Sequence, residues 1–257
     1  IPVSALIKFV HSSVSGGYVV ALAVIGWRAE GGGGAPPPPR PDLSTALAAW
    51  LVRLYLRTVH RLTVEGVEHA AAVVSCGRGV IVTANHAAGI DPLMVQAGLP
   101  FFVRWLVAGE TVAPTVLPFV EFAGVIFLTG SKEQSGRGEL TGVREAVRHV
   151  QSGGAIGIFP EGRIARRPGV ITPFQPGVGL IIGRSRGVVL PAVLSGVPVH
   201  DSAYRAFFVR SRAKVAFMPP IDYRALGVKA GEIVPDLQSR YEEWVGPAVP
   251  PVGRARK

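Results

Sequence analysis

A histidine and an aspartate that could form a catalytic pair lie in the stretch VIVTANHAAGIDPLM, residues 80–94. His86 follows an apolar run at 79–84 that is typical of a buried strand, and Asp91 with Pro92 begins a helical pattern in which we expect Asp91 to cap the helix. Open α/β sheets bind ligands at the carboxyl ends of their strands, so His86 is expected at such an edge. A carboxylate on one ring nitrogen would leave the other nitrogen free to take a substrate proton, as a general base does.

A purely structural role accounts for the same two residues. Asp91 could only cap its helix, and His86 could only satisfy backbone groups of the loop. The spacing by itself does not separate this interpretation from the catalytic one.

A second stretch, AIGIFPEGRIARR at 155–167, also follows an apolar strand. Pro160 ends that strand, Gly162 permits a tight turn, and Glu161 is expected at the same sheet edge as His86. Three arginines follow and offer a cationic patch suited to a phosphate, because guanidinium groups donate forked hydrogen bonds: Arg163, Arg166 and Arg167. An exposed basic turn without a ligand is the alternative, and convergence with His86 on one edge favours a binding site.

The elements that must position these residues alternate along the chain. Short β-branched runs occur at 79–84, 125–129, 155–159 and 188–194, with helical patterns between them. The clearest helical pattern covers 138–152 and stops at two glycines. This alternation predicts an α/β fold with a largely parallel (mixed) sheet flanked by helices.

Composition divides the chain into four parts. Residues 1–30 are hydrophobic and are predicted to form a helical membrane-associated segment, and 31–41 (GGGGAPPPPRP) form a linker. The main domain is predicted at 42–245 and a basic tail at 246–257. The uncharged run at 12–27 is shorter than the roughly 20 residues of a spanning helix, which favours a marginal span or an interfacial anchor over a buried helix.

A helical pattern after the linker carries an apolar stripe together with arginines that lie mostly off it. The stripe consists of Leu43, Leu47, Trp50, Leu51 and Leu54, and the arginines are Arg53, Arg57 and Arg61. The helix could cover the core, or it could rest as a basic amphipathic helix against anionic lipid. The two interpretations are compatible, and both stay open at this point.

The overall charge and hydropathy indicate an anionic partner. The 257 residues carry a net charge of +10, 48% are hydrophobic, and the mean hydropathy is +0.36. The basic residues are scattered rather than interleaved with aromatics, which favours membrane lipid or a phosphorylated substrate over nucleic acid. The single cysteine, Cys76, excludes an intrachain disulfide and a multi-cysteine metal site, and we interpret it as a core or boundary residue.

Together these residues resemble the glycerolipid acyltransferases typified by 1-acyl-glycerol-3-phosphate acyltransferase. The resemblance covers roughly residues 45–220. It is carried by an Asn-His-x4-Asp motif, a Phe-Pro-Glu-Gly motif and an apolar strand with a proline, matched here by Asn85, His86 and Asp91, by Phe159, Pro160, Glu161, Gly162 and Arg163, and by Pro191.

The resemblance implies transfer of a fatty acyl group from acyl-CoA or acyl-carrier protein to the hydroxyl of a lysophospholipid, with 1-acyl-glycerol-3-phosphate as the first candidate. His86 would be the general base and Asp91 would orient it. The acceptor site would include Asn85, Glu161, Gly162 and Pro191, with Arg163 on the phosphate. The resemblance implies no cofactor, no metal and no nucleic acid, and a protein associated with the cytoplasmic face of a membrane.

Two departures from the family pattern concern the acceptor. Gly130 stands where the second motif has a phosphate-binding arginine, which Lys132 or Arg137 could replace, and Gln175 stands where lysine is frequent. Two alternatives therefore stay open. One is an acyltransferase for an amine or a non-phosphorylated lysolipid, and the other is an inactive lipid-binding protein of the membrane surface.

Overall fold

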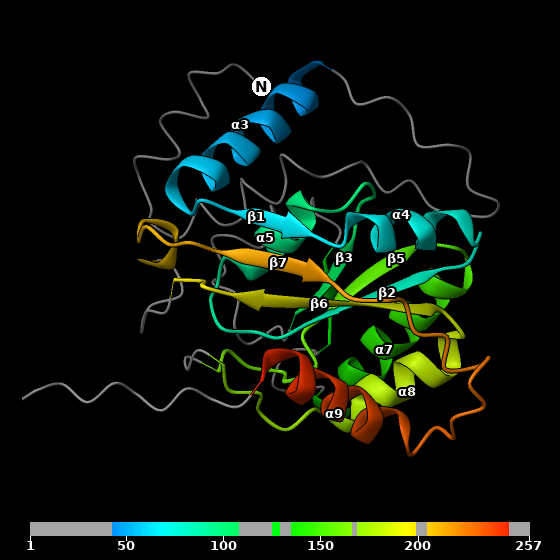
Figure 1. Cartoon of the computed structure of the whole chain (residues 1–257). Coiled ribbons are helices and arrows are strands. Elements are labelled where there is room, and N and C mark those ends of the chain that lie inside the picture. Colours follow the sequence, from blue (N-terminus) through cyan, green and yellow to red (C-terminus); the bar gives the residue numbers. More distant parts are fainter. Residues whose placement is uncertain (1–42, 108–124, 129–134, 166–168, 199–204, 247–257) are drawn as a thin grey trace, which may run out of the picture.

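The computed structural model describes residues 43–107, 125–128, 135–165, 169–198 and 205–246 (Figure 1). Within these residues seven strands form one sheet in the order β1-β7-β6-β2-β5-β3-β4. The strands are β1 (Thr63–Glu65), β2 (Val80–Ala84), β3 (Arg104–Val107), β4 (Ile126–Phe127), β5 (Ala155–Ile158), β6 (Val188–Ser195) and β7 (Lys214–Phe217). Neighbouring strands are parallel except β6 and β7, so the expected largely parallel, mixed sheet is confirmed.

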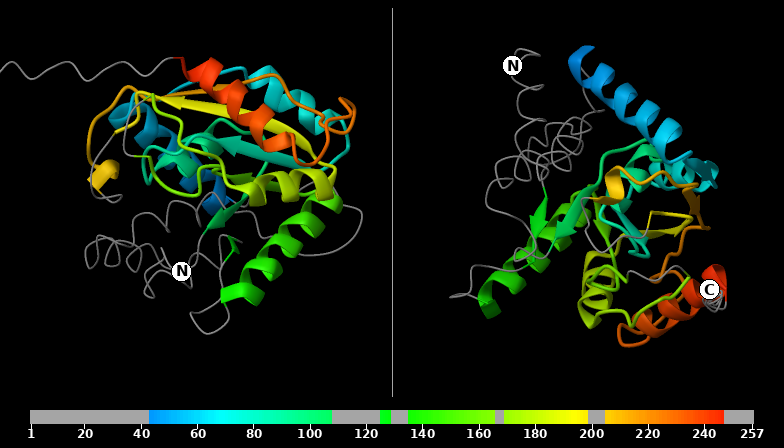
Figure 2. Two further views of the ribbon diagram at one scale, coloured as in Figure 1. Left: turned by 90° about the horizontal axis from the view of Figure 1, so that it is seen from below. Right: turned by 90° about the vertical axis from the view of Figure 1, so that its left-hand side faces the viewer.

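Helices cover both faces of the sheet (Figures 1 and 2). One face carries α3 (Leu43–Val59), α4 (Val67–Ser75) and α5 (Asp91–Ala97), and the other carries α7 (Ser135–Gln151), α8 (Pro176–Ser185) and α9 (Ile233–Val245). A short 3₁₀ turn, η4 (Arg205–Phe207), precedes β7. The fold class predicted from the sequence is therefore confirmed.

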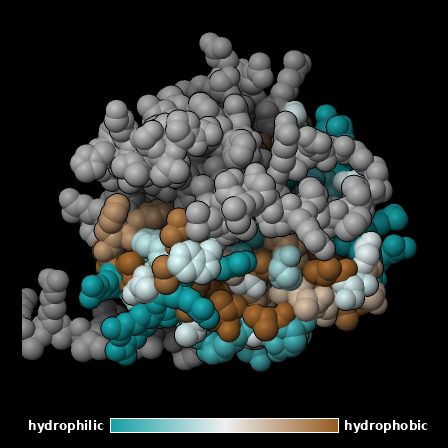
Figure 3. Space-filling model, turned by 90° about the horizontal axis from the view of Figure 1, so that it is seen from above, coloured by the Kyte–Doolittle hydropathy of each residue, from teal (hydrophilic) through white to brown (hydrophobic). Residues whose placement is uncertain are grey.

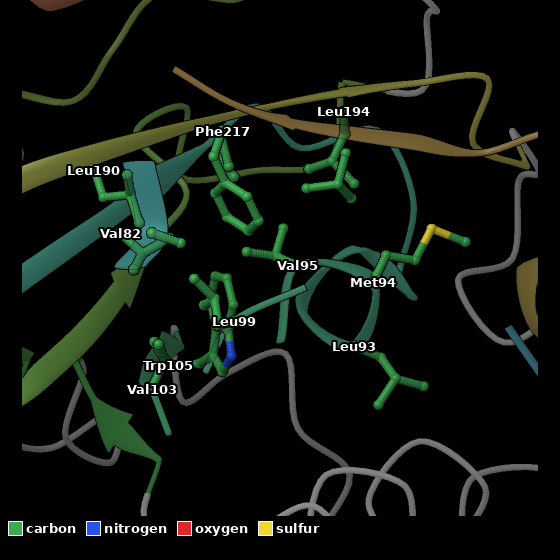
Figure 4. Close-up of a cluster of buried hydrophobic side chains, with 14 of the residues drawn as sticks. Val82, Leu93, Met94, Val95, Leu99, Val103, Trp105, Leu190, Leu194 and Phe217 are labelled. Atoms are coloured by element: carbon green, nitrogen blue, oxygen red, sulfur yellow. The ribbon is translucent and has the colours of Figure 1, made fainter. Parts of the chain in front are cut away.

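The central strand β2 divides its side chains between two hydrophobic cores, one on each face of the sheet. Val80, Val82 and Ala84 of β2 pack with α3, α4 and α5, whereas Ile81 packs with α7, α8 and α9. This alternation follows from the period of two along a strand. Figure 4 shows the first core, where Val82 and Phe217 of the sheet lie close to Val95 of α5. Because β2 is buried on both faces, the loop at its carboxyl end starts from a rigid base.

The structure differs from the sequence prediction at several elements. The expected strand at 125–129 is only two residues long, and the helix expected at 138–152 begins three residues earlier. Three strands were not predicted, β1, β3 and β7, because runs of three or four residues carry too little periodicity. Cys76 is exposed at the end of α4, so the interpretation of this residue as a core or boundary residue is wrong.

The predicted stripe of α3 faces outward where the structure describes it. Trp50, Leu51 and Leu54 are 55%, 51% and 42% exposed, so this stripe does not cover the core, although α3 itself does, as one of the two interpretations expected. Leu43 and Leu47 lie outside the described side chains. The reason is a second stripe with the same helical spacing, Val52, Tyr55, Leu56 and Val59, in which Leu56 is fully buried.

The predicted membrane-associated segment, the linker and nearly all of the basic tail lie outside the described residues. Of the helices that the structure does describe, none combines the length and the apolar character needed to span a membrane. The four-part division of the chain therefore stays a prediction.

Candidate active site

The loop that carries His86 leaves the carboxyl end of β2, in the centre of the sheet. Strands β5 and β6 pair with β2 in parallel on either side, so their carboxyl ends lie next to this loop. The loop after β5 carries Glu161. The structure thus brings together the two stretches that the sequence singled out, at the sheet edge where α/β proteins bind ligands.

His86 and Asp91 form a direct hydrogen bond. The distance from His86 Nδ1 to Asp91 Oδ2 is 2.9 Å, and the same oxygen accepts hydrogen bonds from the backbone nitrogens of Ala87 (2.7 Å) and Ala88 (2.8 Å). Because a carboxylate only accepts hydrogen bonds, Nδ1 carries the proton and Nε2 is left as an acceptor. The imidazole is therefore held in one tautomer.

The burial of the pair differs between its two members. The Asp91 side chain is completely buried, whereas the His86 side chain is 16% exposed, so solvent reaches the ring but not the carboxylate. Asp91 Oδ1 has no hydrogen-bond partner among the described residues.

Asp91 is not the helix cap that the sequence predicted. The N-cap position of α5 is Ile90, and no side chain caps this helix end. Asp91 is the first residue of α5, and its carboxylate turns back to the loop that precedes it. The expectation was wrong by one position, because the helix begins at Asp91 itself and Ile90 takes the N-cap position.

The carboxylate of Glu161 fixes the backbone of His86. Its Oε1 accepts a hydrogen bond from the His86 nitrogen (2.9 Å), and its Oε2 accepts from Thr172 N (3.0 Å) and Thr172 Oγ1 (2.5 Å). The carbonyl of His86 in turn accepts from the nitrogen of Ala165 (2.7 Å). Glu161 is 1% exposed, so its carboxylate serves these three donors and lies away from solvent.

Two aromatic rings fix the plane of the imidazole. Phe159 stacks on His86, with ring centroids 4.0 Å apart and an 18° angle between the planes, and Trp105 stacks on Phe159 at 4.9 Å and 16°. Gly157 makes room for the indole, since a Cβ there would lie 2.5 Å from Trp105 Cε3. Phe159 belongs to a motif visible in the sequence, but no local signal marks Trp105, Thr172 or Ala165 as members of the site.

Asn85 and Pro191 tie the loop to β6. Asn85 Nδ2 donates to the carbonyl of Leu194 (3.0 Å), and Asn85 Oδ1 accepts from the Leu194 nitrogen (2.7 Å). Pro191 is buried within β6 opposite Thr83 of β2, and its carbonyl accepts from the nitrogen of Met218. Both residues therefore shape the edge on which His86 stands.

Of the remaining predicted residues, the structure describes only Gly162 and Arg163 in full. Gly162 adopts a left-handed conformation (φ 66°) in a turn closed by a hydrogen bond from its nitrogen to the Phe159 carbonyl, and Arg163 follows it as an exposed side chain. Lys132, Arg166 and Arg167 lie outside the described residues, and so does the side chain of Arg137 at the start of α7.

Tyr241 of α9 supports the strand beneath the site. Its buried hydroxyl lies 3.0 Å from Thr83 Oγ1 and 3.3 Å from both the nitrogen and the carbonyl oxygen of Ala192. Burial raises the pKa of Tyr241 far above its ordinary value, so this hydroxyl stays protonated. In the part of the chain that the structure describes, no three His, Cys, Asp or Glu side chains gather as ligands for a metal ion.

Comparison with known proteins adds two findings. A family model described as Acyltransferase matches residues 61–195, just over half of the chain. The fold is similar to the crystal structure of the 1-acyl-sn-glycerophosphate (LPA) acyltransferase, PlsC, from Thermotoga maritima, with a TM-score of 0.60 and 18% sequence identity over 94% of this chain and 89% of that one. The family match includes His86, Asp91 and Glu161.

Proposed function

This chain belongs to the acyltransferase family, and we propose that it transfers a fatty acyl group from acyl-CoA or acyl-carrier protein to the free hydroxyl of a lysophospholipid. The proposed acceptor is 1-acyl-glycerol-3-phosphate, and the product is phosphatidate. The observation that carries the proposal is the 2.9 Å contact between His86 Nδ1 and Asp91 Oδ2, which leaves Nε2 of a partly exposed ring free to accept a proton.

The proposed reaction begins with the acceptor hydroxyl next to His86. Nε2 takes the hydroxyl proton as the oxygen attacks the carbonyl carbon of the thioester. The tetrahedral intermediate breaks its C–S bond, and the leaving sulfur takes the proton back from the imidazolium. One ester bond forms, one thioester bond breaks, and His86 returns to its starting state.

Asp91 stabilises the imidazolium in this scheme, because its buried charge lies next to the ring when the ring is doubly protonated. Glu161 and Phe159 act as positioning residues. They hold the backbone and the ring plane of His86 without contacting the acceptor. Such preorganisation lets the base meet the hydroxyl in a reactive geometry.

For the acceptor, we propose that the guanidinium of Arg163 binds the phosphate. Arg163 follows directly after the turn at Gly162. It lies on the same loop as Glu161, which accepts a hydrogen bond from the backbone nitrogen of His86. An exposed guanidinium there can donate two parallel hydrogen bonds to a phosphate. Lys132 and Arg137 remain candidates for a second phosphate contact.

We further propose that the protein is associated with the cytoplasmic face of a membrane and needs no cofactor besides its acyl donor. A lipid acceptor and water-soluble donors meet at a membrane surface. The net charge of +10 and the exposed apolar and basic residues of α3 suit an anionic bilayer.

The test is a transfer assay with labelled acyl-CoA and acyl-carrier protein against a panel of acceptors. The panel holds lysophosphatidate, lysophosphatidylcholine, monoacylglycerol and a long-chain amine. We expect ester formation on lysophosphatidate above all, and Arg163→Ala should raise the KM for that acceptor about tenfold or more, whereas the matched control Arg224→Ala should not. Transfer only to a non-phosphorylated acceptor would replace the proposed substrate, and no transfer at all would contradict the proposed activity.

A further inference from the structure

The segment between η4 and β7 exposes an aromatic side chain. Phe208 is 77% exposed, the largest fraction among the exposed large hydrophobic residues that the structure describes, and Val209 beside it is 37% exposed. Arg210 and Arg212 follow, both exposed and without an ion pair to another described residue. An aromatic tip followed by arginines is the composition of a segment that enters the interface of an anionic bilayer.

A partly buried hydrogen-bond network holds this segment against α3. The Tyr55 hydroxyl donates to the carbonyl of Phe207, and it lies 2.9 Å from His60 Nε2. His60 Nδ1 lies 3.0 Å from Ser211 Oγ, and the carbonyl of His60 accepts from the nitrogen of Ala213 (2.9 Å). The His60 side chain is fully buried. Phe208 is therefore displayed on a fixed support.

Residues 208–212 lie at the same sheet edge as the active site. Lys214, which follows the segment, pairs with Ser195 at the carboxyl end of β6. The adjacent residue of β6, Leu194, holds Asn85 through two hydrogen bonds, and His86 comes next in the chain. Figure 1 shows η4, in golden yellow, beside the carboxyl end of α3 and the end of β6.

The exposed face of α3 extends the same surface. Trp50, Leu51 and Leu54 are apolar and exposed, and Arg53 and Arg57 lie among them at helical spacing. Five of the nine exposed large hydrophobic residues that the structure describes belong to α3 or to the pair Phe208–Val209. Figure 3, which views the α3 side of the molecule, shows apolar and hydrophilic residues next to one another on its described part.

We propose that residues 208–212 form a membrane-contacting loop. Phe208 and Val209 enter the interfacial layer of an anionic bilayer, Arg210 and Arg212 bind lipid phosphates, and the network around His60 couples the loop to α3. The two contacts together turn the edge with His86 towards the lipid that carries the acceptor. The lipid acceptor rests on the proposed function, whereas the loop's contact with a bilayer rests on its own residues.

Binding to vesicles by the full chain tests this inference. The vesicles contain phosphatidylcholine with about 30% phosphatidylglycerol, and sedimentation gives the partition coefficient. We expect Phe208→Ser to lower the coefficient about tenfold, since it removes one buried aromatic side chain from the interface. Arg210→Glu with Arg212→Glu should lower it at least tenfold, and this loss should shrink at high salt.

The far edge of the sheet supplies a matched control. Leu226 is 58% exposed and lies between Arg224 and Lys229, near the amino-terminal end of β6. Leu226→Ser and Arg224→Glu should leave vesicle binding within about twofold of wild type. Thermal unfolding checks that each variant keeps its fold, which is expected because all the changed side chains are exposed. Equal binding by Phe208→Ser and wild type would overturn the inference.

A dispersed substrate separates this inference from the proposed function. With a short-chain lysophosphatidate below its micellar concentration, Phe208→Ser should retain wild-type turnover, because Phe208 lies outside the catalytic machinery. With lysophosphatidate in anionic vesicles, the same variant should lose activity in proportion to binding. A wild-type protein without transferase activity whose vesicle binding still depends on Phe208 would contradict the proposed function alone.

Discussion

The nitrogen of His86 donates a hydrogen bond to Oε1 of Glu161, although the two residues come from loops that follow different strands. The carbonyl of His86 is held by Ala165 of the same second loop. The imidazole therefore has a fixed backbone as well as a fixed tautomer, and the carboxylate of Glu161 contributes to the first of these.

Replacing Glu161 by glutamine should reduce turnover more than acceptor binding. In the wild type, three donors bind to the two carboxylate oxygens of Glu161. A glutamine has only one side-chain oxygen that accepts, so a buried donor loses its partner at a cost of about 1–3 kcal/mol. We expect urea denaturation to show this loss of stability, and kcat to fall about tenfold or more with KM for the acceptor nearly unchanged.

Thr172→Val is the matched control for that variant. It removes only the hydroxyl donor to Oε2 and keeps the bond to His86. Its kcat should stay within about threefold of wild type. A Glu161→Gln protein with normal kcat and a raised KM would mean that Glu161 contacts the acceptor and does not act as a positioning residue.

Adding a methyl group at Gly157 should disturb the aromatic stack behind His86. The new Cβ would lie 2.5 Å from Trp105 Cε3, and a large indole ring between packed neighbours cannot shift freely. We expect Gly157→Ala to lose about 1–3 kcal/mol in stability and to lower kcat, as measured by urea denaturation and initial rates.

Gly177→Ala is the comparison for this change, because a Cβ at Gly177, in the first turn of α8, would meet no atom within 4 Å. It should leave kcat unchanged and leave stability equal or higher by about 0.5 kcal/mol. If Gly157→Ala and Gly177→Ala have the same kcat and stability, the packing of Trp105 against Gly157 does not set the position of His86.

Two histidines, the buried His60 and the half-buried His149, should make folding stability depend on pH. Burial lowers the pKa of His60 below its ordinary value of 6.5, and burial with the nearby Arg104 charge lowers the pKa of His149. The unfolded chain then binds protons that the folded chain resists, so stability is fully present above pH 6.5 and falls as the pH drops through 6.5 towards the folded values.

Urea denaturation between about pH 5 and 8 measures this dependence. His60→Gln and His149→Gln should each reduce the slope of stability against pH below 6.5, and the double variant should reduce it further. The carboxylates of Asp222 and Asp236 do not disturb this window, because their pKa values lie below 3.8 through hydrogen bonds from Arg78 and Arg240. An unchanged slope in the double variant would contradict the assignment.

The sequence was informative where local spacing determines structure. The buried strands before His86 and Glu161 are marked by their apolar runs, and parallel pairing then places both loops at one edge. Trp105 could not be predicted as a neighbour of Phe159, because their contact depends on how β3 packs beside β5.

Three of the errors have identifiable physical causes. Two apolar stripes of equal spacing occur on α3, and only tertiary packing selects the one with Leu56. Asp91 lies one position inside α5 rather than at its N-cap, and its carboxylate accepts hydrogen bonds from the loop before it. The antiparallel strand β7 has only four residues, too few for a period to be recognised.

The hydrogen bond from His86 Nδ1 to Asp91 predicts that removing the Asp91 charge lowers the rate of transfer. Asp91→Asn should lower kcat at least a hundredfold, because an amide that keeps the contacts to Ala87 and Ala88 does not stabilise the imidazolium. Initial rates at saturating donor measure this effect, and unchanged binding of the acceptor separates it from a loss of the site. An Asp91→Asn protein within threefold of wild type would show that the carboxylate only organises the loop.

The most direct measurement is the single-turnover rate of acyl transfer by His86→Ala, compared with wild type and with His69→Ala on α4. Thermal unfolding of the three proteins checks that the fold is intact. If Nε2 of His86 takes the hydroxyl proton, the His86→Ala rate falls about 10²–10⁴-fold while His69→Ala matches wild type. A folded His86→Ala protein that transfers the acyl group at a rate near wild type would contradict the role of His86 as the base.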